Sequence, residues 1–204
     1  MYRQQSLITL DQFYEIKPLT KLESILSFID YSLFEEVFPY DSNKRGPKGY
    51  SKKQLFNTLI AMQIEQLSDI KALVMRLKSD PVLRRSLGYD YIENTPSAAT
   101  LNRFITLLSG TDILGRTFRR MVCKAIKLGL IDGTNVAIDA SKLTSYEHAV
   151  PKSKIPIDDP TFPNWGGKLD TNGNFIKWFG WIMHALVDTY SGLPISYIIT
   201  PANI

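Results

Sequence analysis

The spacing of apolar residues changes at Leu130, and this change constrains the fold more than any other feature of the sequence. Before Leu130, apolar side chains recur every three or four residues, which is the spacing of amphipathic helices. After it, short runs rich in β-branched and aromatic residues alternate with segments rich in Pro and Gly. That alternation is typical of strands and loops. The sequence therefore predicts an α+β chain, helical first and β-stranded afterwards.

Five or six short helices are expected before Leu130, each starting at a residue that caps helix N-termini. The expected N-caps are Thr20, Ser51, Ser68, Asp80 and Ser97. Thr20 forms a capping box with Glu23, and its helix is expected to run to Pro39. The last helix covers residues 112–128 and ends at Gly129. Residues 1–18 are expected to form an arm with a short helix near Leu10 to Tyr14.

Three strands are expected after Leu130. The first is Asn135 to Ala140, and the other two, Phe175 to Val187 and Leu193 to Thr200, form a hairpin. Residues 144–173 are expected to be an irregular loop, because they are rich in Pro and Gly. Three strands without a covering helix do not bury a stable core, so we expect the chain to stop within a larger fold. The predicted domains are residues 1–45, 46–130 and 131–204.

Positive charge is concentrated in two blocks that contain no acidic residue, although the net charge is only +4. Such blocks suit a polyanionic partner. For either block alone, a solvated helix face explains the charge equally well. The blocks span residues 42–64 and 113–130, and their basic residues are Lys44, Arg45, Lys48, Lys52, Lys53, Arg116, Arg119, Arg120, Lys124 and Lys127.

The sequence also indicates the cellular compartment in which the protein is expected. The apolar fraction of 44% and the charged fraction of 22% are those of a globular protein. Cys123 is the single cysteine, so no intrachain disulfide is possible and a reducing compartment fits. The N-terminus has no apolar signal-peptide core, and the most apolar run, residues 178–187, is too short to span a membrane. A cytoplasmic protein without a membrane partner is expected.

Asp139 follows the apolar run Val136 to Ile138 directly. An ionised carboxylate at the end of a buried strand is costly unless it is paired, hydrogen-bonded or bound to a metal. One interpretation is therefore a metal ligand. The alternative is a turn residue whose side chain caps the backbone after the strand, as Asp often does.

Several stretches together resemble a known family. They are GYSKKQLFNTLI (49–60), NTPSAATLNRFI (94–105), VAIDASKL (136–143) and WGGKLDTNGNFIKWFGWIMHALVDTYSGLPISYIITPAN (165–203). In this order they resemble bacterial insertion-sequence transposases of the DDE class, in the branch with a helical N-terminal domain. The resemblance extends from about residue 45 to the end of the chain.

The resemblance implies a ribonuclease H-like catalytic domain, of which residues 131–204 would supply the first three strands. In that family two Asp and one Glu hold two divalent metals, Mg²⁺ or Mn²⁺, and the first Asp corresponds to Asp139. Hard oxygen ligands suit these ions, and a metal pair supports phosphoryl transfer. The other two carboxylates are expected beyond Ile204, so this chain alone is expected not to cleave DNA.

Two other polar residues near the strands are interpreted as structural residues. Asp188 lies in the turn Asp188 to Gly192, where turn chemistry alone explains an Asp. His184 matches the end of a Gly-Tyr-Lys-x-His pattern in the relatives, but Trp181 and Ile182 replace the Tyr and the Lys. A packed strand histidine is therefore the preferred interpretation. Gly166 and Gly167 lack the strand and helix context of a phosphate loop. For Trp165, Trp178 and Trp181, stacking on splayed bases is one interpretation, and ordinary packing is the preferred one.

Two regions are candidates for binding double-stranded DNA at the transposon ends and the target. Lys44 to Lys53 would contact phosphates at a helix N-terminus. The helices around Ser97 to Phe104 resemble a helix-turn-helix, with Asn102 and Arg103 as base or phosphate contacts. Arg116, Arg120, Lys124 and Lys127 form a further basic stripe on one helix face.

The function implied is DNA transposition: the full-length protein would cut and join strands as a nucleoid-associated homo-oligomer. One alternative is a truncated, non-catalytic DNA-binding protein that inhibits transposition. Another is a nuclease that hydrolyses DNA without strand transfer.

Overall fold

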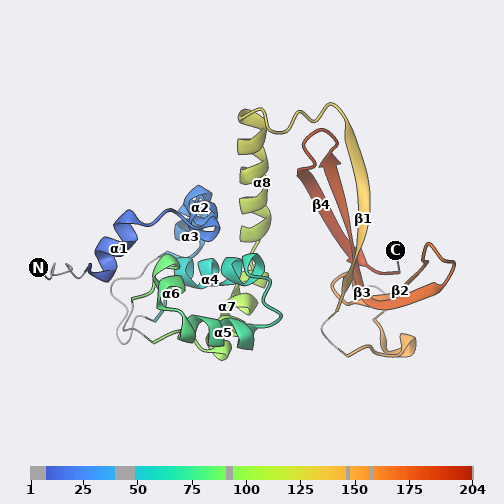
Figure 1. The fold of residues 1–204 in the computed structure, drawn as a ribbon. Helices are drawn as coiled ribbons and strands as arrows, with labels where there is room; N and C mark the ends of the chain where they lie inside the picture. Colours follow the sequence, from blue (N-terminus) through green and yellow to red (C-terminus); the bar gives the residue numbers. More distant parts are fainter. Residues whose placement is uncertain (1–7, 40–48, 91–93, 146–147, 157–158, 204) are drawn as a thin grey trace, which may run out of the picture. The chain divides into compact units, whose positions relative to one another are not determined.

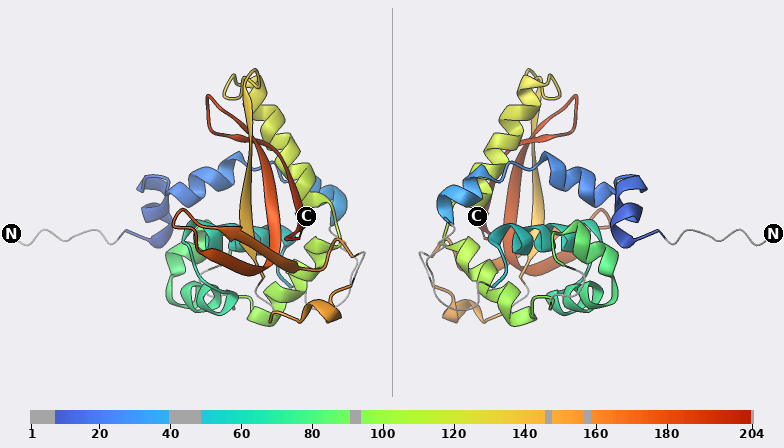
Figure 2. Two further views of the ribbon diagram at one scale, coloured as in Figure 1. Left: turned by 90° about the vertical axis from the view of Figure 1, so that its right-hand side faces the viewer. Right: turned by 90° about the vertical axis from the view of Figure 1, so that its left-hand side faces the viewer.

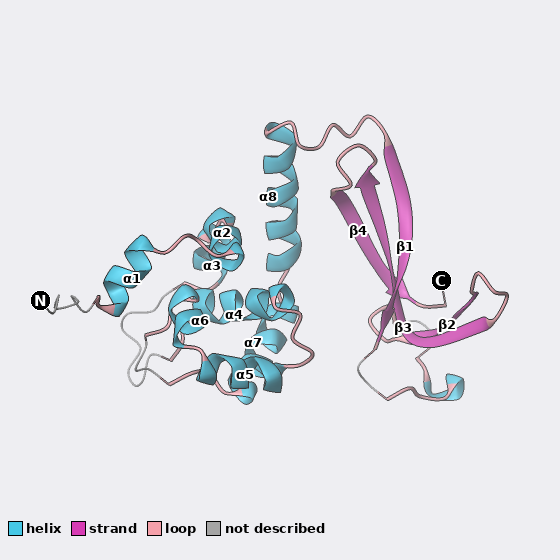
Figure 3. Cartoon of the chain, in the orientation of Figure 1, coloured by secondary structure: helices cyan, strands magenta, loops and turns pink. Residues whose placement is uncertain are grey.

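The computed structural model describes residues 8–39, 49–90, 94–145, 148–156 and 159–203. The chain divides into two compact units, Met1–Thr117 and Phe118–Ile204. Helices form the first unit, and a sheet forms most of the second (Figures 1 and 3). The α+β class and the order of helices before strands are therefore as predicted. The boundary between the units falls within the last helix, α8 (Ile113–Lys127).

The helices of the first unit start where their capping residues predict. Thr20, Ser51, Asp80 and Ser97 are N-caps as expected, whereas Asp69 replaces the expected Ser68. The helices before α8 are α1 (Leu10–Ile16), α2 (Lys21–Phe28), α3 (Ser32–Val37), α4 (Lys52–Ile64), α5 (Ile70–Ser79), α6 (Pro81–Ser86) and α7 (Ala98–Ser109).

The prediction of a single helix from Thr20 to Pro39 is wrong, because the structure has two helices there, α2 and α3. Ile29 takes an extended conformation with φ −77° and ψ 129°, which ends α2. The Asp30 carboxylate then accepts a hydrogen bond of 3.0 Å from the backbone N–H of Ser32. Such a local bond competes with the helix ladder and starts a new turn. The break lets Leu33 and Phe34 of α3 enter the core, where they are 0% and 3% exposed.

The core of the first unit is built from leucines and aromatic rings of α2 to α7 and the start of α8. Phe34 and Phe56 pack with their ring centroids 4.4 Å apart. The buried polar side chains of Asn57 and Thr58 have hydrogen-bond partners, as burial favours. The Thr58 and Tyr89 hydroxyls are 2.8 Å apart, and the Tyr31 hydroxyl donates to Asn57 Oδ1 at 2.6 Å. The buried apolar residues are Leu22, Leu26, Leu33, Phe34, Leu55, Phe56, Ala61, Leu73, Leu77, Leu83, Leu87, Tyr89, Leu101, Phe104, Leu108 and Ile113.

The second unit contains an antiparallel sheet with the long strand β3 at its centre. The strands are β1 (Val136–Thr144), β2 (Asn164–Leu169), β3 (Phe175–Asp188) and β4 (Pro194–Pro201). β3 pairs with each of the other three, and Figure 2 shows β1, β3 and β4 running side by side. A short 3-10 helix, Lys152–Lys154, lies in the connection between β1 and β2.

Two strand predictions are wrong. β1 runs to Thr144 and not to Ala140, because all nine of its residues pair with β3. β2 lies within the segment predicted to be a loop, where Gly166 and Gly167 favour a loop by residue type alone. In the sheet these glycines make room for rings of β3. A Cβ atom on Gly166 would lie 2.5 Å from Cζ2 of Trp178, and one on Gly167 would overlap the ring of Phe175.

Much of the sheet surface is open to solvent, as expected for strands without covering helices. Cross-strand partners share a face, so Asp139, Ala185 and Tyr197 lie on one side. On that side the ring of Phe118, in α8, packs edge-on against Tyr197 at a centroid distance of 5.1 Å. On the other side Ile138 is 76% exposed and Ile198 is 64% exposed.

The apolar residues of α8 are also largely exposed. Leu114 and Met121 have exposed fractions of 47% and 53%, and Leu128, directly after the helix, is 65% exposed. Their regular spacing therefore marks an amphipathic helix whose apolar side is only partly covered. Among the helices of the described ranges, none has both the length and the apolar character that crossing a membrane requires.

Candidate nucleic-acid interface and catalytic carboxylate

The N-terminus of α4 gathers positive charge. The Ser51 hydroxyl accepts a hydrogen bond from the Gln54 N–H at 3.1 Å, and the Gln54 side chain accepts one from the Ser51 N–H at 2.9 Å. This capping box starts the helix at Lys52 and Lys53, and the first turn contains no acidic residue. The N-terminal end of a helix already carries partial positive charge. Two lysines there are unfavourable for the free helix and favourable for a bound anion.

Aromatic rings hold both lysines at the edge of the helical core. Lys52 Nζ lies 5.9 Å from the ring centroid of Phe104, and Lys53 Nζ lies 4.4 Å from that of Tyr31. Such cation–π contacts favour a defined position for an otherwise flexible side chain. Neither lysine forms an ion pair with a carboxylate of the described residues. Their charges therefore stay available to a polyanion.

α7 carries the second pair of residues that the sequence predicts to contact DNA. Asn102 and Arg103 are exposed, whereas Leu101, Phe104 and Leu108 are buried. Ile105 of the same helix is 38% exposed. Because Lys52 reaches the ring of Phe104, the N-terminus of α4 and the middle of α7 are neighbours. The first unit thus brings Lys52 close to the helix that carries Arg103.

The basic residues of α8 do not form one uniform stripe. Arg116 is paired with Glu36 of α3, at 2.8 Å between Nη2 and Oε1. This pair is not predictable from local sequence, because 80 residues separate the two side chains. Arg120, Lys124 and Lys127 are exposed further along the helix. Lys44, Arg45 and Lys48 lie outside the described residues.

Asp139 is exposed and lies within β1, where its partner is Ala185 of β3. The expectation of a buried carboxylate at a strand end is therefore wrong, and water can solvate its charge. Two-metal sites need several hard oxygen ligands converging on the ions. Within the described ranges, no three His, Cys, Asp or Glu residues are grouped so that they could hold a metal. The residues around Asp139 thus do not by themselves fit a pair of Mg²⁺ ions.

Asp188 organises the turn between β3 and β4, as predicted. Its side chain is almost fully buried and accepts hydrogen bonds from the Ser191 hydroxyl at 2.7 Å, the Ser191 N–H at 2.8 Å and the Gly133 N–H at 3.0 Å. The Ser191 hydroxyl, together with these backbone donors, lowers the pKa of the Asp188 carboxyl below its usual value. The carboxylate is fully occupied by the turn.

His184 is a half-buried strand residue, in agreement with the preferred interpretation. Its Nε2 lies 3.2 Å from the Thr200 hydroxyl of the neighbouring strand β4. This contact gives the ring a partner within the sheet. By contrast, a cavity beside β2, where Trp165 and Gly167 line the wall, was not predicted. The alternation Trp165, Gly167 and Phe175, Lys177 on two strands is the signal that could have found it.

Comparisons with known proteins match the helical region. Residues 9–107 match the family model described as "Transposase domain (DUF772)". This similarity to a transposase domain supports a transposase-related family and a role in transposition. Neither the curated proteins nor the solved structures yield a match to the chain.

Proposed function

We propose that this chain acts in transposition by binding double-stranded DNA, with Lys52 and Lys53 contacting phosphates at the N-terminus of α4. The observation that carries the proposal is the pair of cations in a capped first helical turn that contains no acid. Backbone N–H groups and the helix dipole add to the attraction for a phosphate. A transposase-related match over residues 9–107 supports DNA as the polyanion.

The first unit offers further candidate contacts. Asn102 and Arg103 are exposed on α7, whose Phe104 contacts Lys52. Arg side chains can bind guanine or phosphate, and Asn side chains can bind adenine. We assign Lys52 and Lys53 to positioning on phosphates, and Asn102 and Arg103 to bases or neighbouring phosphates. We also propose that the exposed Arg120, Lys124 and Lys127 of α8 take part in DNA binding. Arg116 of the same helix is paired with Glu36.

For catalysis, we propose Asp139 as one ligand of a divalent-metal site of the DDE type in a ribonuclease H-like domain. The proposal rests on the family resemblance of the strand that carries it. The described residues around it do not fit a metal pair, so we expect residues 1–204 to bind DNA without cleaving it. We also propose strand cleavage and joining as the activity of the family that the chain resembles, and assembly as a homo-oligomer.

The first prediction tests the phosphate contacts with the double variant Lys52→Gln and Lys53→Gln. Each cation removed from a phosphate lowers the slope of log affinity against log salt by about 0.9. We therefore expect a slope smaller by about 1.8 and weaker binding on all duplex sequences. Retention of a labelled duplex at several salt concentrations measures both quantities.

The matched control is Lys71→Gln with Lys78→Gln, which removes two exposed lysines from α5 of the same unit. Both double variants remove the same net charge, so only local contacts distinguish them. An equal decrease of the slope in both would contradict an α4 site. If the unaltered chain retains no duplex at low salt, the proposed function itself is wrong.

A further inference from the structure

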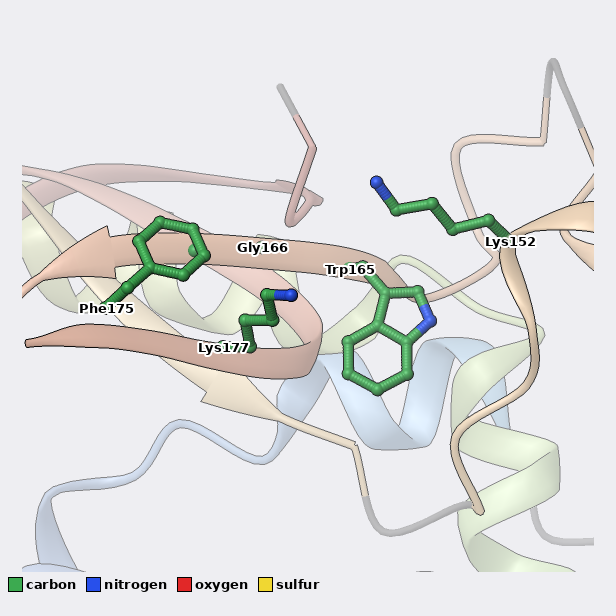
Figure 4. Close-up of a pocket in the computed structure, with 6 residues that line it drawn as sticks. Lys152, Trp165, Gly166, Phe175 and Lys177 are labelled. Carbon is green, nitrogen blue, oxygen red and sulfur yellow. The ribbon is translucent and has the colours of Figure 1, made fainter.

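A cavity of about 330 Å³ lies beside strand β2 in the second unit. It is within the size range of small-molecule sites, whose volumes run from about 300 Å³ upward. Two aromatic rings, two lysines and the backbone of two glycines line it: Trp165, Phe175, Lys152, Lys177, Gly166 and Gly167. Figure 4 shows both lysine side chains and both rings around the opening.

The register of β2 and β3 explains why these groups meet. Trp165 pairs with Phe179 and Gly167 pairs with Lys177, so these four residues share one face of the sheet. Leu169 pairs with Phe175 and continues that face. Because Gly167 has no side chain, the ring of Phe175 can occupy the space above it, on the face that also carries Trp165. A Cβ at Gly167 would overlap the Phe175 ring, so the glycine lets that ring lie close over the strand.

The rings are held in place to different degrees. Trp165 Nε1 donates a hydrogen bond to the Val150 carbonyl at 2.8 Å, and its ring packs 5.5 Å from the ring of Phe179. Trp165 is half-buried, which keeps part of its surface accessible. Phe175 is 59% exposed, so much of its ring is accessible. An exposed ring beside a fixed ring provides surfaces on which a planar group can stack.

The cations stand next to these surfaces. Lys177 Nζ lies 5.7 Å from the centroid of the Phe175 ring, and Lys152 approaches from the 3-10 helix before β2. Both lysines are exposed, and neither forms an ion pair with a carboxylate of the described residues. A ligand with a planar π system and a nearby negative charge complements this arrangement. A nucleotide has both features.

We propose that this cavity binds one unpaired nucleotide of a DNA strand, with its base against Phe175 and Trp165 and its phosphate between Lys152 and Lys177. Stacking on aromatic side chains and contact with cations are the general means of binding single strands. The proposal rests on the proposed function, because it takes DNA as the partner. It adds a site in the second unit that accepts a base outside the duplex.

The second prediction tests this site with the 204-residue chain and a short single-stranded oligonucleotide that contains one 2-aminopurine. Stacking should quench the 2-aminopurine fluorescence on binding. Phe175→Leu keeps an apolar side chain and removes the ring, so we expect affinity to fall about five- to fiftyfold, within the range of about 1–3 kcal/mol per stacked base, together with less quenching. Lys152→Gln with Lys177→Gln should lower the salt slope by about 0.7 for each phosphate that no longer meets a cation.

Lys168→Gln is the control, because Lys168 is exposed on β2 and its side chain lies on the opposite face. It should leave affinity and quenching unchanged. Equal effects of Lys168→Gln and the pocket variants, or full quenching with Phe175→Leu, would overturn the proposal. Free thymidine monophosphate forms a separate arm: binding as tight as that of the oligonucleotide would identify a mononucleotide site and overturn the assignment to a DNA strand.

The outcomes for the two proposals are distinguishable. Duplex retention that depends on Lys52 and Lys53, with single-strand quenching that ignores Phe175, would support the α4 interface and refute the pocket. Quenching that depends on Phe175 without duplex retention would refute the α4 interface and support the pocket. An unaltered thermal unfolding transition of the second unit, followed by the fluorescence of its tryptophans, would show that Phe175→Leu remains folded.

Discussion

At the scale of single residues, the clearest electrostatic feature is Glu23, which joins three segments of the first unit. Its carboxylate binds Lys17 Nζ at 2.6 Å, the Thr20 N–H at 2.9 Å and the Ser86 hydroxyl at 2.7 Å. Burial alone would raise the pKa of Glu23. The hydrogen bonds from Lys17, Thr20 and Ser86 outweigh that effect and lower the pKa from 4.5 to about 2.

A third prediction follows for stability against pH. Because the folded-state pKa of Glu23 is depressed, its contribution is present above pH 4.5 and is lost as the pH falls towards 2. A shift of this size corresponds to a contribution on the order of 3 kcal/mol. Glu23→Gln should lower the free energy of unfolding at neutral pH and flatten its decline below pH 4.5. Urea unfolding followed by helical circular dichroism at several pH values measures both effects.

Glu15→Gln is the control for this prediction, since it changes an exposed carboxylate on α1. It should shift the unfolding free energy little and leave its pH dependence as in the unaltered chain. An unchanged acid-side slope in Glu23→Gln would contradict the role assigned to the Glu23 cluster.

At the scale of elements, β2 depends on glycine at two adjacent positions for different neighbours. Gly166 faces the indole of Trp178, which is only 8% exposed, and Gly167 faces the exposed ring of Phe175. A buried indole has little room to move, whereas an exposed ring can rotate away. The two faces of one short strand should therefore respond differently to the same substitution.

The fourth prediction compares Gly166→Ala with Gly167→Ala. The new Cβ at residue 166 would lie 2.5 Å from Trp178 Cζ2 and 2.9 Å from Ala202 Cβ. Forcing extra atoms into a packed site typically costs about 1–3 kcal/mol. We expect Gly166→Ala to destabilise the second unit by about that amount, and Gly167→Ala to cost less. Thermal unfolding monitored by tryptophan fluorescence distinguishes them, and equal destabilisation by both would contradict this account of β2.

At the scale of the whole molecule, the two units carry different proposed tasks. The first presents Lys52 and Lys53 for duplex phosphates, and the second carries Asp139 and the pocket. Metal-assisted cleavage needs carboxylates gathered from several elements. Among the described residues, Asp139 is not part of any group of three His, Cys, Asp or Glu residues that could hold a metal ion. Binding and cleavage should therefore be separable in residues 1–204.

The fifth prediction is that Asp139→Ala leaves the stability and the duplex affinity of residues 1–204 within error of the unaltered chain. Asp139 is exposed and lies in the second unit, whereas the α4 cations belong to the first. Neither protein should nick supercoiled DNA with Mg²⁺. Robust nicking that survives Asp139→Ala would refute Asp139 as a metal ligand, whereas nicking that the substitution abolishes would refute only the expected inactivity.

Sequence alone was sufficient for several features whose deciding contact is local. N-caps at Ser51 and Asp80 bond to backbone groups three residues ahead, and the Asp188 turn closes on Ser191. The order of helices and strands follows from the spacing of apolar residues in the same way. These features involve neighbours in the chain, so their residue types are sufficient to predict them. The position of Lys52 and Lys53 in a first helical turn was predictable for this reason.

Tertiary structure decided the features that depend on distant residues. The break before α3 allows Leu33 and Phe34 to reach a core built from other helices. In β2, two glycines make room for aromatic rings of β3. Arg116 pairs with Glu36, and the two residues are 80 positions apart in the sequence. The pocket combines two strands and the 3-10 helix. The spacing of residue types along the chain does not reveal such partners, because packing between distant segments determines which side chains meet.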